Sequence, residues 1–299
     1  MYETEWFDLK ADTPITALLG VPGVRWARLD GNRTVQIHRS HLPLLTGGFS
    51  VGDSIIDFTR DSARLDQETE KNGWALRAYQ HEARHFIQHR RGTLLADTMR
   101  LGKTPVCVAS HELSEGSMVV VGPKASRHVW TSWFKRRWPD VKPAILQGET
   151  LDRDLLMSSP LVFLHYDILP YWQTSGFFEI GTVVFDEAHL LSNSRSRRHE
   201  AAILLAAQAK RVIAATGTPL WNSPQGLYAL LTLVTPGAWG NYKQFTERYC
   251  GGHPGAYGWV CDGPTNEEEL KRRLTTVMLR RTWDDVEEDL PQTVRTVCV

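Results

Sequence analysis

The pattern of apolar and polar positions changes along the chain at about Asn72. From there, short apolar runs of strand length alternate with amphipathic stretches of helical length. Several runs are apolar at every position, which is typical of strands buried on both faces of a parallel sheet. The pattern predicts strands at 93–96, 118–121, 143–146, 161–164, 182–185 and 212–215, with helices at 127–138 and 198–210 among the connections. This alternation predicts an α/β fold, a doubly wound parallel sheet with helices on both faces.

The two ends of the chain differ from this central region. Near the N-terminus, two short alternating runs flank Asp30-Gly31, and this dipeptide predicts a β hairpin. We interpret residues 1–70 as a small accessory module with this hairpin, and a plain packing extension is the alternative. After about Gly240 the pattern predicts a helix at 241–249, a loop at 250–263, a helix at 266–281 with Asn266 as its N-cap, and a final strand at 290–299. The predicted regions are therefore 1–70, 71–240 and 241–299.

The composition is that of an ordinary globular protein, with 42% hydrophobic and 23% charged residues in a chain of 299. The formal net charge is zero, so any contact with nucleic acid must come from local basic clusters. No apolar stretch is long enough to span a membrane, and the acidic N-terminal segment is not a signal peptide. The four cysteines form no CxxC pair, which favours a reducing compartment, and Cys250, His253 and Cys261 fit no closed zinc site. We expect a cytoplasmic protein, with a bacterial or phage source preferred, or a nuclear protein if the source is a eukaryote.

The first pattern that carries chemistry is LLADTMRLGKT at 94–104, which predicts a strand, a turn and a helix that begins after Gly102. A phosphate loop has this order, because backbone N–H groups at the start of the helix hold the phosphates. In that interpretation Lys103 reaches the β and γ phosphate oxygens, and the Thr104 hydroxyl binds Mg²⁺. The alternative for a lone Gly-Lys-Thr is an ordinary helix start. The other nucleotide-binding candidates are the residues of the turn: Asp97, Thr98, Met99, Arg100 and Leu101.

The second pattern is VVFDEAHLL at 183–191, a buried strand that ends in two acids. Asp186 is placed to hold the magnesium ion, usually through water, and Glu187 is placed to orient and deprotonate the attacking water. Alone, an Asp-Glu pair at a strand end is more often a surface turn. Downstream of a phosphate loop, the pair predicts a phosphoryl-transfer site in which Lys103, Asp186 and Glu187 are the catalytic residues.

The third pattern is RVIAATGTPLWN at 211–222, another strand that ends in small hydroxyl residues. Thr216, Gly217 and Thr218 can hydrogen-bond to the acidic pair and sense the γ-phosphate. A plain strand-to-turn signal produces the same pattern and is the alternative. We expect His189 to couple the acidic pair to this third motif rather than to bind a metal.

In this order and spacing, the three motifs resemble those of the first RecA-like lobe of superfamily-two helicase-like ATPases, and specifically of the Swi/Snf group. LRAYQ at 76–80 resembles the group's adenine-recognising motif, and the segments at 119–139, 162–169 and 219–245 resemble other motifs of the group. The stretch at 249–291 is similar to the annealing-helicase (HARP-type) branch, and 25–45 faintly resembles its substrate-recognition module. The resemblance covers 72–299 well and the first 70 residues poorly. It implies a RecA-like P-loop fold, ATP and Mg²⁺ as cofactors, and DNA-dependent, helicase-like hydrolysis of ATP.

The resemblance also implies binding roles for particular residues. It places Gln80 against the adenine edge. It implies contacts with the DNA backbone, without sequence specificity, at Lys124, Ser126, His165 and Tyr166. We interpret the helix at 127–138 itself as a solvated face whose tryptophans pack inward. For the arginines at 195, 197 and 198, contact with DNA and plain solvation both remain open.

Two departures from the group change the expected function. The group reads DEMGLGKT, whereas this chain reads DTMRLGKT, with Thr98 in place of an acid and Arg100 in place of a glycine. A side chain at position 100 strains a turn of positive φ, and its cation can hold nucleotide without helping turnover. The sequence ends where the first lobe of the group ends, so we expect a second RecA-like lobe with its arginine finger to act in trans. The leading prediction is the ATP-binding lobe of a DNA translocase or annealing helicase. The alternatives are a nucleotide-gated DNA-binding module without turnover, half of a split motor, and a truncated fragment.

Overall fold

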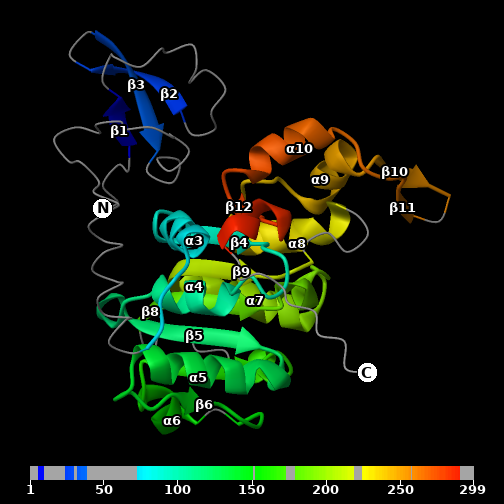
Figure 1. Ribbon diagram of the computed structural model, residues 1–299. Helices are drawn as coiled ribbons and strands as arrows, with labels where there is room; N and C mark the ends of the chain where they lie inside the picture. Colours follow the sequence, from blue (N-terminus) through cyan, green and yellow to red (C-terminus); the bar gives the residue numbers. More distant parts are fainter. Residues whose placement is uncertain are drawn as a thin grey trace, which may run out of the picture.

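The computed structural model describes residues 6–9, 24–29, 32–38, 73–150, 152–172, 179–218, 224–256 and 258–289. Its main element is a seven-stranded sheet, parallel throughout, with the strand order β12-β4-β9-β8-β5-β7-β6 (Figure 1). The strands are β4 (Gly92–Leu95), β5 (Ser117–Gly122), β6 (Ala144–Ile145), β7 (Leu161–His165), β8 (Ile180–Asp186), β9 (Ala209–Ala215) and β12 (Met278–Leu279). Each strand predicted for the central region is present, and the crossed order is that of a doubly wound sheet.

Helices cover both faces of the sheet, because successive strand residues point to opposite sides. Val120 and Val184 are buried on one face, in a cluster with side chains of three helices: α3 (Ala78–Gln88), α4 (Lys103–Ala109) and α5 (Arg127–Arg137). Their neighbours Val119 and Val183 are buried on the opposite face, with side chains of α7 (Arg197–Gln208) and α8 (Pro224–Val234). The predicted fold class is therefore confirmed. Within the described part of the chain, every helix is too short or too polar to cross a lipid bilayer.

The region after α8 differs from the prediction in two places. The predicted helix is α9 (Tyr242–Tyr249), but the predicted loop that follows contains an antiparallel hairpin, β10 (Gly252–Gly255) and β11 (Gly258–Cys261). The helix predicted at 266–281 ends early as α10 (Glu267–Leu274), and its continuation pairs with β4 as β12. The β-branched run Thr275-Thr276-Val277 favours a strand over a helix, which explains the early end. Asn266 has a φ of 49° and makes no side-chain cap, and its amide donates instead to the Arg248 carbonyl at 2.6 Å.

The predicted N-terminal hairpin is present. Strand β2 (Val24–Leu29) pairs antiparallel with β3 (Asn32–His38), so that Leu29 lies opposite Asn32 across the Asp30-Gly31 dipeptide. Strand β1 (Trp6–Leu9), which the pattern did not predict, pairs with the other edge of β3. The strand predicted at 290–299 lies outside the described residues. The remaining short elements are η2 (Leu113–Glu115), η3 (Lys124–Ser126), α6 (Arg153–Met157), η4 (Leu169–Tyr171), η5 (Ala188–Leu191) and η6 (Asp284–Asp289).

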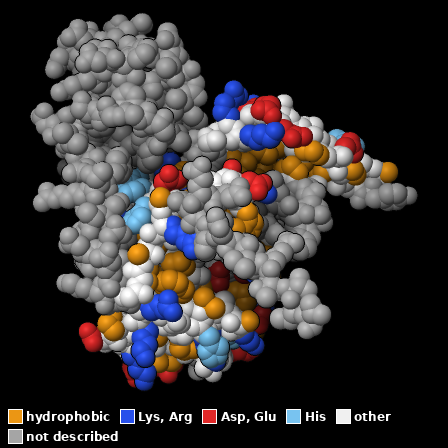
Figure 2. All heavy atoms as spheres, viewed as in Figure 1, with side chains coloured by type: hydrophobic (Ala, Val, Ile, Leu, Met, Phe, Trp, Pro, Cys, Tyr) orange, Lys and Arg blue, Asp and Glu red, His pale blue; other side chains and the backbone are white. Residues whose placement is uncertain are grey.

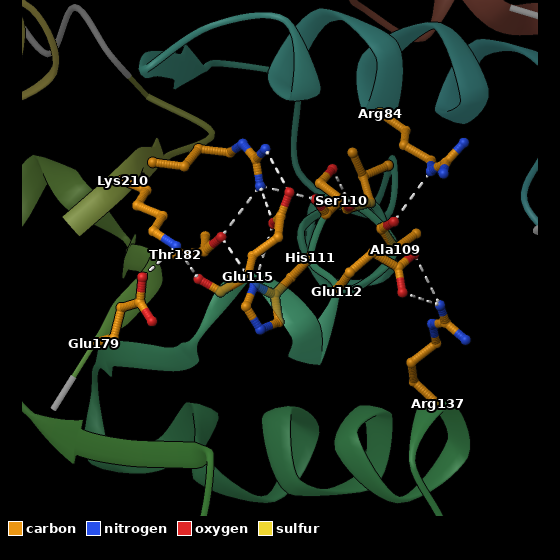
Figure 3. A network of polar contacts seen from close by, with 12 residues as sticks. Arg84, Ala109, Ser110, His111, Glu112, Glu115, Arg137, Glu179, Thr182 and Lys210 are labelled. Carbon is orange, nitrogen blue, oxygen red and sulfur yellow. Dashed lines mark hydrogen bonds and ion pairs between the residues drawn. The ribbon is translucent and has the colours of Figure 1, made fainter. Parts of the chain in front are cut away.

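A polar network closes the sheet at the end where β5, β8 and β9 begin (Figure 3). Arg211 donates to the Glu115 carboxylate at 2.8 Å and to the Ser110 carbonyl at 3.2 Å. The imidazole Nδ1 of buried His111 lies 3.0 Å from the Thr182 hydroxyl. Burial lowers the pKa of His111 to about 4, although the Glu115 carboxylate opposes the shift. This end of the sheet serves stability, and the predicted functional motifs lie at the opposite, carboxyl ends of the strands.

Candidate nucleotide site

The turn between β4 and α4 has the backbone of a phosphate loop. Gly102 precedes the first residue of α4 with a φ of 80°, and a Cβ there would lie 2.3 Å from the Gln80 amide nitrogen. Arg100 also has a positive φ, 69°, in the region that glycine adopts without penalty. A left-handed conformation costs a residue with a Cβ about 1–2 kcal/mol. The arginine at 100 therefore strains this loop, which is the case considered from the sequence.

Lys103 lies over the loop rather than in solvent. Its Nζ donates to the carbonyls of Asp97 at 2.7 Å and Thr98 at 3.2 Å. Burial lowers the pKa of this ammonium, and the Glu187 carboxylate is the largest opposing influence. Gly217 of the third motif lies close to the loop at this point. A Cβ atom added to this glycine would lie 2.8 Å from Met99 Cγ and 3.7 Å from Lys103 Nζ. A glycine at 217 lets the two segments approach.

Asp97 faces away from the groove of the loop. Its carboxylate is buried and pairs with Arg281, whose Nη2 lies 2.5 Å and whose Nε lies 3.1 Å from the two oxygens. The Arg281 backbone N–H also donates to this carboxylate at 3.0 Å, and its Nη1 donates to the Tyr79 carbonyl. The Asp97 carboxylate is thus engaged by protein, and the nucleotide contact expected of this residue remains a prediction. Its side chain fixes the segment after β12 to the phosphate loop.

Gln80 also reaches the loop, but its amide is engaged with protein. Its Oε1 accepts from the Arg77 N–H at 3.0 Å, and its Nε2 donates to the Leu101 carbonyl at 3.1 Å. The Tyr79 hydroxyl donates to the same carbonyl at 3.0 Å. These bonds fasten the start of α3 to the phosphate loop. The Gln80 Nε2 also donates to the Tyr79 hydroxyl at 3.4 Å, so protein groups engage both amide hydrogens, and the adenine contact expected of Gln80 remains a prediction.

The acidic pair lies at the carboxyl end of β8. Trp130, buried on α5, donates its indole N–H to Asp186 Oδ2 at 2.8 Å. The Tyr166 hydroxyl donates to the Asp186 backbone carbonyl at 2.7 Å. The Tyr166 side chain is buried, which does not fit the DNA contact expected of it. The sequence interpretation missed Trp130, because inward packing of the tryptophans did not predict a polar contact.

Glu187 is held in a left-handed conformation with a φ of 52°. The His189 Nδ1 lies 3.2 Å from Glu187 Oε2 and 3.2 Å from the Thr216 hydroxyl. That hydroxyl also accepts from the Thr218 backbone N–H at 3.1 Å. His189 therefore lies between the acidic pair and the third motif, and the coupling expected of it remains a prediction.

Two of the other residues expected at DNA, Lys124 and His165, lie beside Asp167. Lys124 is exposed, with Nζ 3.8 Å from Asp167 Oδ2, and His165 Nδ1 lies 3.6 Å from the same oxygen. Arg198 donates to Asp167 Oδ1 at 2.9 Å. The Ser126 hydroxyl donates to the Pro123 carbonyl at 3.0 Å and thus shapes the turn before α5. We call Lys124, His165, Arg198 and Asp167 the basic cluster.

The neighbouring helix α5 matches the interpretation of a solvated face. Trp130 and Phe134 are buried, whereas Lys135 and Arg136 are exposed. Arg137 is buried and donates to the Glu112 carboxylate at 3.3 Å. On the face drawn in Figure 2, basic side chains alternate with apolar and acidic ones.

A groove of about 650 Å³ opens over the phosphate loop. Its lining includes Arg77, Gln80, Arg100, Gly102, Thr104 and Trp283. Among the described residues, no cluster of three histidine, cysteine or acidic side chains could hold a metal. Mg²⁺ needs no such cluster, because one carboxylate, a hydroxyl and the phosphates of a nucleotide suffice. Thr104 and Asp186 fit that donor set.

A parallel sheet with a phosphate loop after β4 and an acidic pair after β8 defines a RecA-like, P-loop ATPase lobe. Within that class, the chain belongs to the family of SNF2-related domains, whose model matches residues 25–299. This membership implies nucleotide binding, and the shared motifs are those found from the sequence.

Similar proteins agree with the assignment. The SWI/SNF-related matrix-associated actin-dependent regulator of chromatin subfamily A-like protein 1 of Xenopus tropicalis is 32% identical over 79% of this chain. The human DNA annealing helicase and endonuclease ZRANB3 is 26% identical over 88% of the chain. The SWI2/SNF2 ATPase core of Sulfolobus solfataricus, solved in complex with double-stranded DNA, superposes with a TM-score of 0.61. It is 26% identical and covers 73% of this chain and 47% of its own.

These relatives agree with the annealing-helicase branch expected from the sequence. The chain spans 25% of the length of each of the two curated relatives named above. Both relatives come from vertebrates, and they give no support to a bacterial or phage source.

Proposed function

We propose that this chain is the ATP-binding lobe of a DNA-dependent, helicase-like ATPase that moves along or anneals DNA. The observation that carries the proposal is the meeting of three strand ends. Lys103, the Asp186–Glu187 pair and the His189–Thr216 contact come from β4, β8 and β9, which are neighbours in the sheet. A lysine, a metal carboxylate and a water-orienting acid are the groups that phosphoryl transfer requires.

The residues at the site fit ATP and magnesium. In this proposal, Mg²⁺-bound ATP supplies the phosphoryl group that is transferred to water. The backbone N–H groups at the start of α4 hold the phosphates, and Lys103 neutralises their charge. Glu187 orients the water and accepts its proton. The Thr218 hydroxyl is buried and has no hydrogen-bond partner among the described residues, which is expected of a group that meets a ligand.

We further propose that DNA phosphates bind at the basic cluster. Asp167 is the protein's own counterion for this cluster, because Lys124, His165 and Arg198 all lie beside its carboxylate. A DNA phosphate would take over Lys124 without sequence preference. We expect Lys124→Ala to weaken duplex binding and to reduce the slope of log affinity against log salt by about 1. Asp167→Asn should strengthen binding. Unchanged salt dependence in Lys124→Ala would place the DNA elsewhere.

The proposal includes a second RecA-like lobe, because the resemblance to the Swi/Snf group implies an arginine finger that this second lobe supplies. An arginine finger contributes roughly 10³–10⁵ to the rate. We propose that this lobe acts in trans on the chain. The competing function, nucleotide-gated DNA binding without turnover, is favoured by Arg100, whose cation lines the groove beside the phosphate loop.

Two substitutions test the proposed function. Lys103→Ala should abolish binding of ATP, because the ammonium that faces the phosphates is lost. Glu187→Gln should retain ATP binding and lose DNA-stimulated phosphate release. The measurements are equilibrium binding of ATP and release of phosphate with and without duplex DNA. If the parent chain releases no phosphate while ATP still changes its DNA affinity, the gated module replaces the ATPase.

A further inference from the structure

The segment after β12 is anchored to the nucleotide site at two points. At its start, Arg281 is bonded to the Asp97 carboxylate and the Tyr79 carbonyl. Further along, Val286 is buried in a small cluster with Tyr79 and Leu101. Between these anchors the Thr282 N–H and hydroxyl both donate to Asp285 Oδ2 at 2.7 Å, which fixes the turn. The backbone from 281 to 286 is therefore held rigidly against the phosphate loop.

Trp283 lies in the exposed stretch between the two buried anchors and is the one large apolar side chain there. Its side chain is 40% exposed, whereas Arg281 and Val286 on either side are buried. It lines the groove that also contains Gly102 and Thr104. A large indole held in a rigid turn, with one part open to a groove, is the arrangement of a binding surface rather than of a core residue.

The chemistry of the lining residues indicates where each part of a nucleotide would bind in the groove. Phosphates belong at Gly102 and Thr104, where α4 begins, so the rest of a nucleotide extends along the remaining lining residues. Gln80 is one of these lining residues, and its amide oxygen already accepts a hydrogen bond from the Arg77 N–H. Hydrogen bonding to a base is thus restricted, and an aromatic face is what the groove offers it.

We propose that Trp283 stacks on the base of the bound nucleotide and supplies a large part of its affinity. The inference rests on the proposed nucleotide site and adds the residue that recognises the base. Stacking on an indole favours the larger face of a purine over a pyrimidine and discriminates little between purines, since every base has a π-face. Arg281 is the positioning residue that holds the indole at the groove.

The experiment compares two ligands that share phosphates but differ in the base. Mg²⁺-bound ADP and Mg²⁺-bound tripolyphosphate are titrated calorimetrically into the parent chain, Trp283→Ala and Trp283→Phe. Trp259→Ala is the matched control, because this tryptophan on β11 is partly exposed and does not line the groove. Tryptophan fluorescence is recorded during the ADP titration, and the difference between the parent chain and Trp283→Phe isolates the contribution of Trp283 from that of Trp133, which lines the same groove.

We expect Trp283→Ala to weaken ADP binding on the order of tenfold and to leave tripolyphosphate binding unchanged. Trp283→Phe should recover most of the lost ADP affinity, because its ring can still stack on the base. The fluorescence change that Trp283 itself contributes on ADP binding should be absent from this variant. Equal ADP affinity in Trp283→Ala and the parent overturns the inference, and so does an equal loss for both ligands. If the parent chain binds neither ligand, the nucleotide site itself is wrong and the inference falls with it.

Discussion

The hydrogen bond from Trp130 to Asp186 allows a quantitative test of the magnesium site. The indole N–H donates to Asp186 Oδ2 at 2.8 Å from a ring that is 1% exposed. Trp130→Phe keeps an aromatic ring on α5 and removes the donor. A hydrogen bond to a charged group contributes about 1.5–3 kcal/mol. Loss of such a bond to a ligating carboxylate typically costs about 10–100-fold in metal affinity. We expect the Mg²⁺ concentration for half-maximal nucleotide binding to rise by this factor.

The assay is anisotropy of a fluorescent ATP analogue, titrated with MgCl₂ at fixed protein. Trp138→Phe is the matched control, because Trp138 follows the same helix and packs on Phe134 and His111, away from the acidic pair. A circular-dichroism melt verifies that each variant is folded at the assay temperature. An unchanged Mg²⁺ midpoint in folded Trp130→Phe would show that the indole does not position Asp186 for the metal.

Three further predictions concern the stability and charge of the lobe. Arg281→Met breaks the buried pair with Asp97 and should lower the free energy of unfolding in urea by about 3–5 kcal/mol; a loss below about 1 kcal/mol would contradict the pairing. Arg100→Gly removes left-handed strain of about 1–2 kcal/mol but adds chain entropy of about 0.5–1 kcal/mol, so stability should rise slightly while ATP affinity falls; undiminished affinity would count against a phosphate contact. His111, whose pKa burial lowers from 6.5 to about 4, stays neutral in the fold and takes up a proton on unfolding. Its contribution is complete above pH 6.5 and is lost as the pH falls towards 4, by about 3 kcal/mol at most. His111→Gln should flatten urea-unfolding stability over this pH interval, and an unaltered profile would show that other groups cause the loss.

The sheet was predictable because each of its longer strands has a clear local signal in the sequence. Val119 to Val121 and Val183 to Phe185 are continuous apolar runs, and burial on both faces leaves such runs few alternatives. β12 was not predictable in this way. Its two residues follow a helical pattern, and only pairing with β4, far away in sequence, makes them a strand. The β10–β11 hairpin has no Asn-Gly or Asp-Gly turn, and its glycines predicted a loop.

The motif residues were predictable, whereas their partners were not. Lys103 and Glu187 lie within contiguous motifs, so one short window contains the signal. Arg281 binds Asp97 across 184 residues, and Trp130 binds Asp186 across 56. A single sequence contains no sign of such distant pairs. Tyr166 shows the opposite case, because its motif was found and its side chain turned out to point into the core.

The order of strands in the sheet has a consequence for how the lobe folds during synthesis. Strand β4 leads into the phosphate loop, yet its described neighbours in the sheet are β9 and β12, which the ribosome makes more than 100 residues later. The first motif therefore leaves the ribosome without the strands that flank it, and β5 is likewise separated from β4 by strands that follow it in the chain. Contacts of such long sequence separation form slowly. We therefore expect nucleotide to bind the completed sheet, and to stabilise the folded lobe rather than guide its early folding.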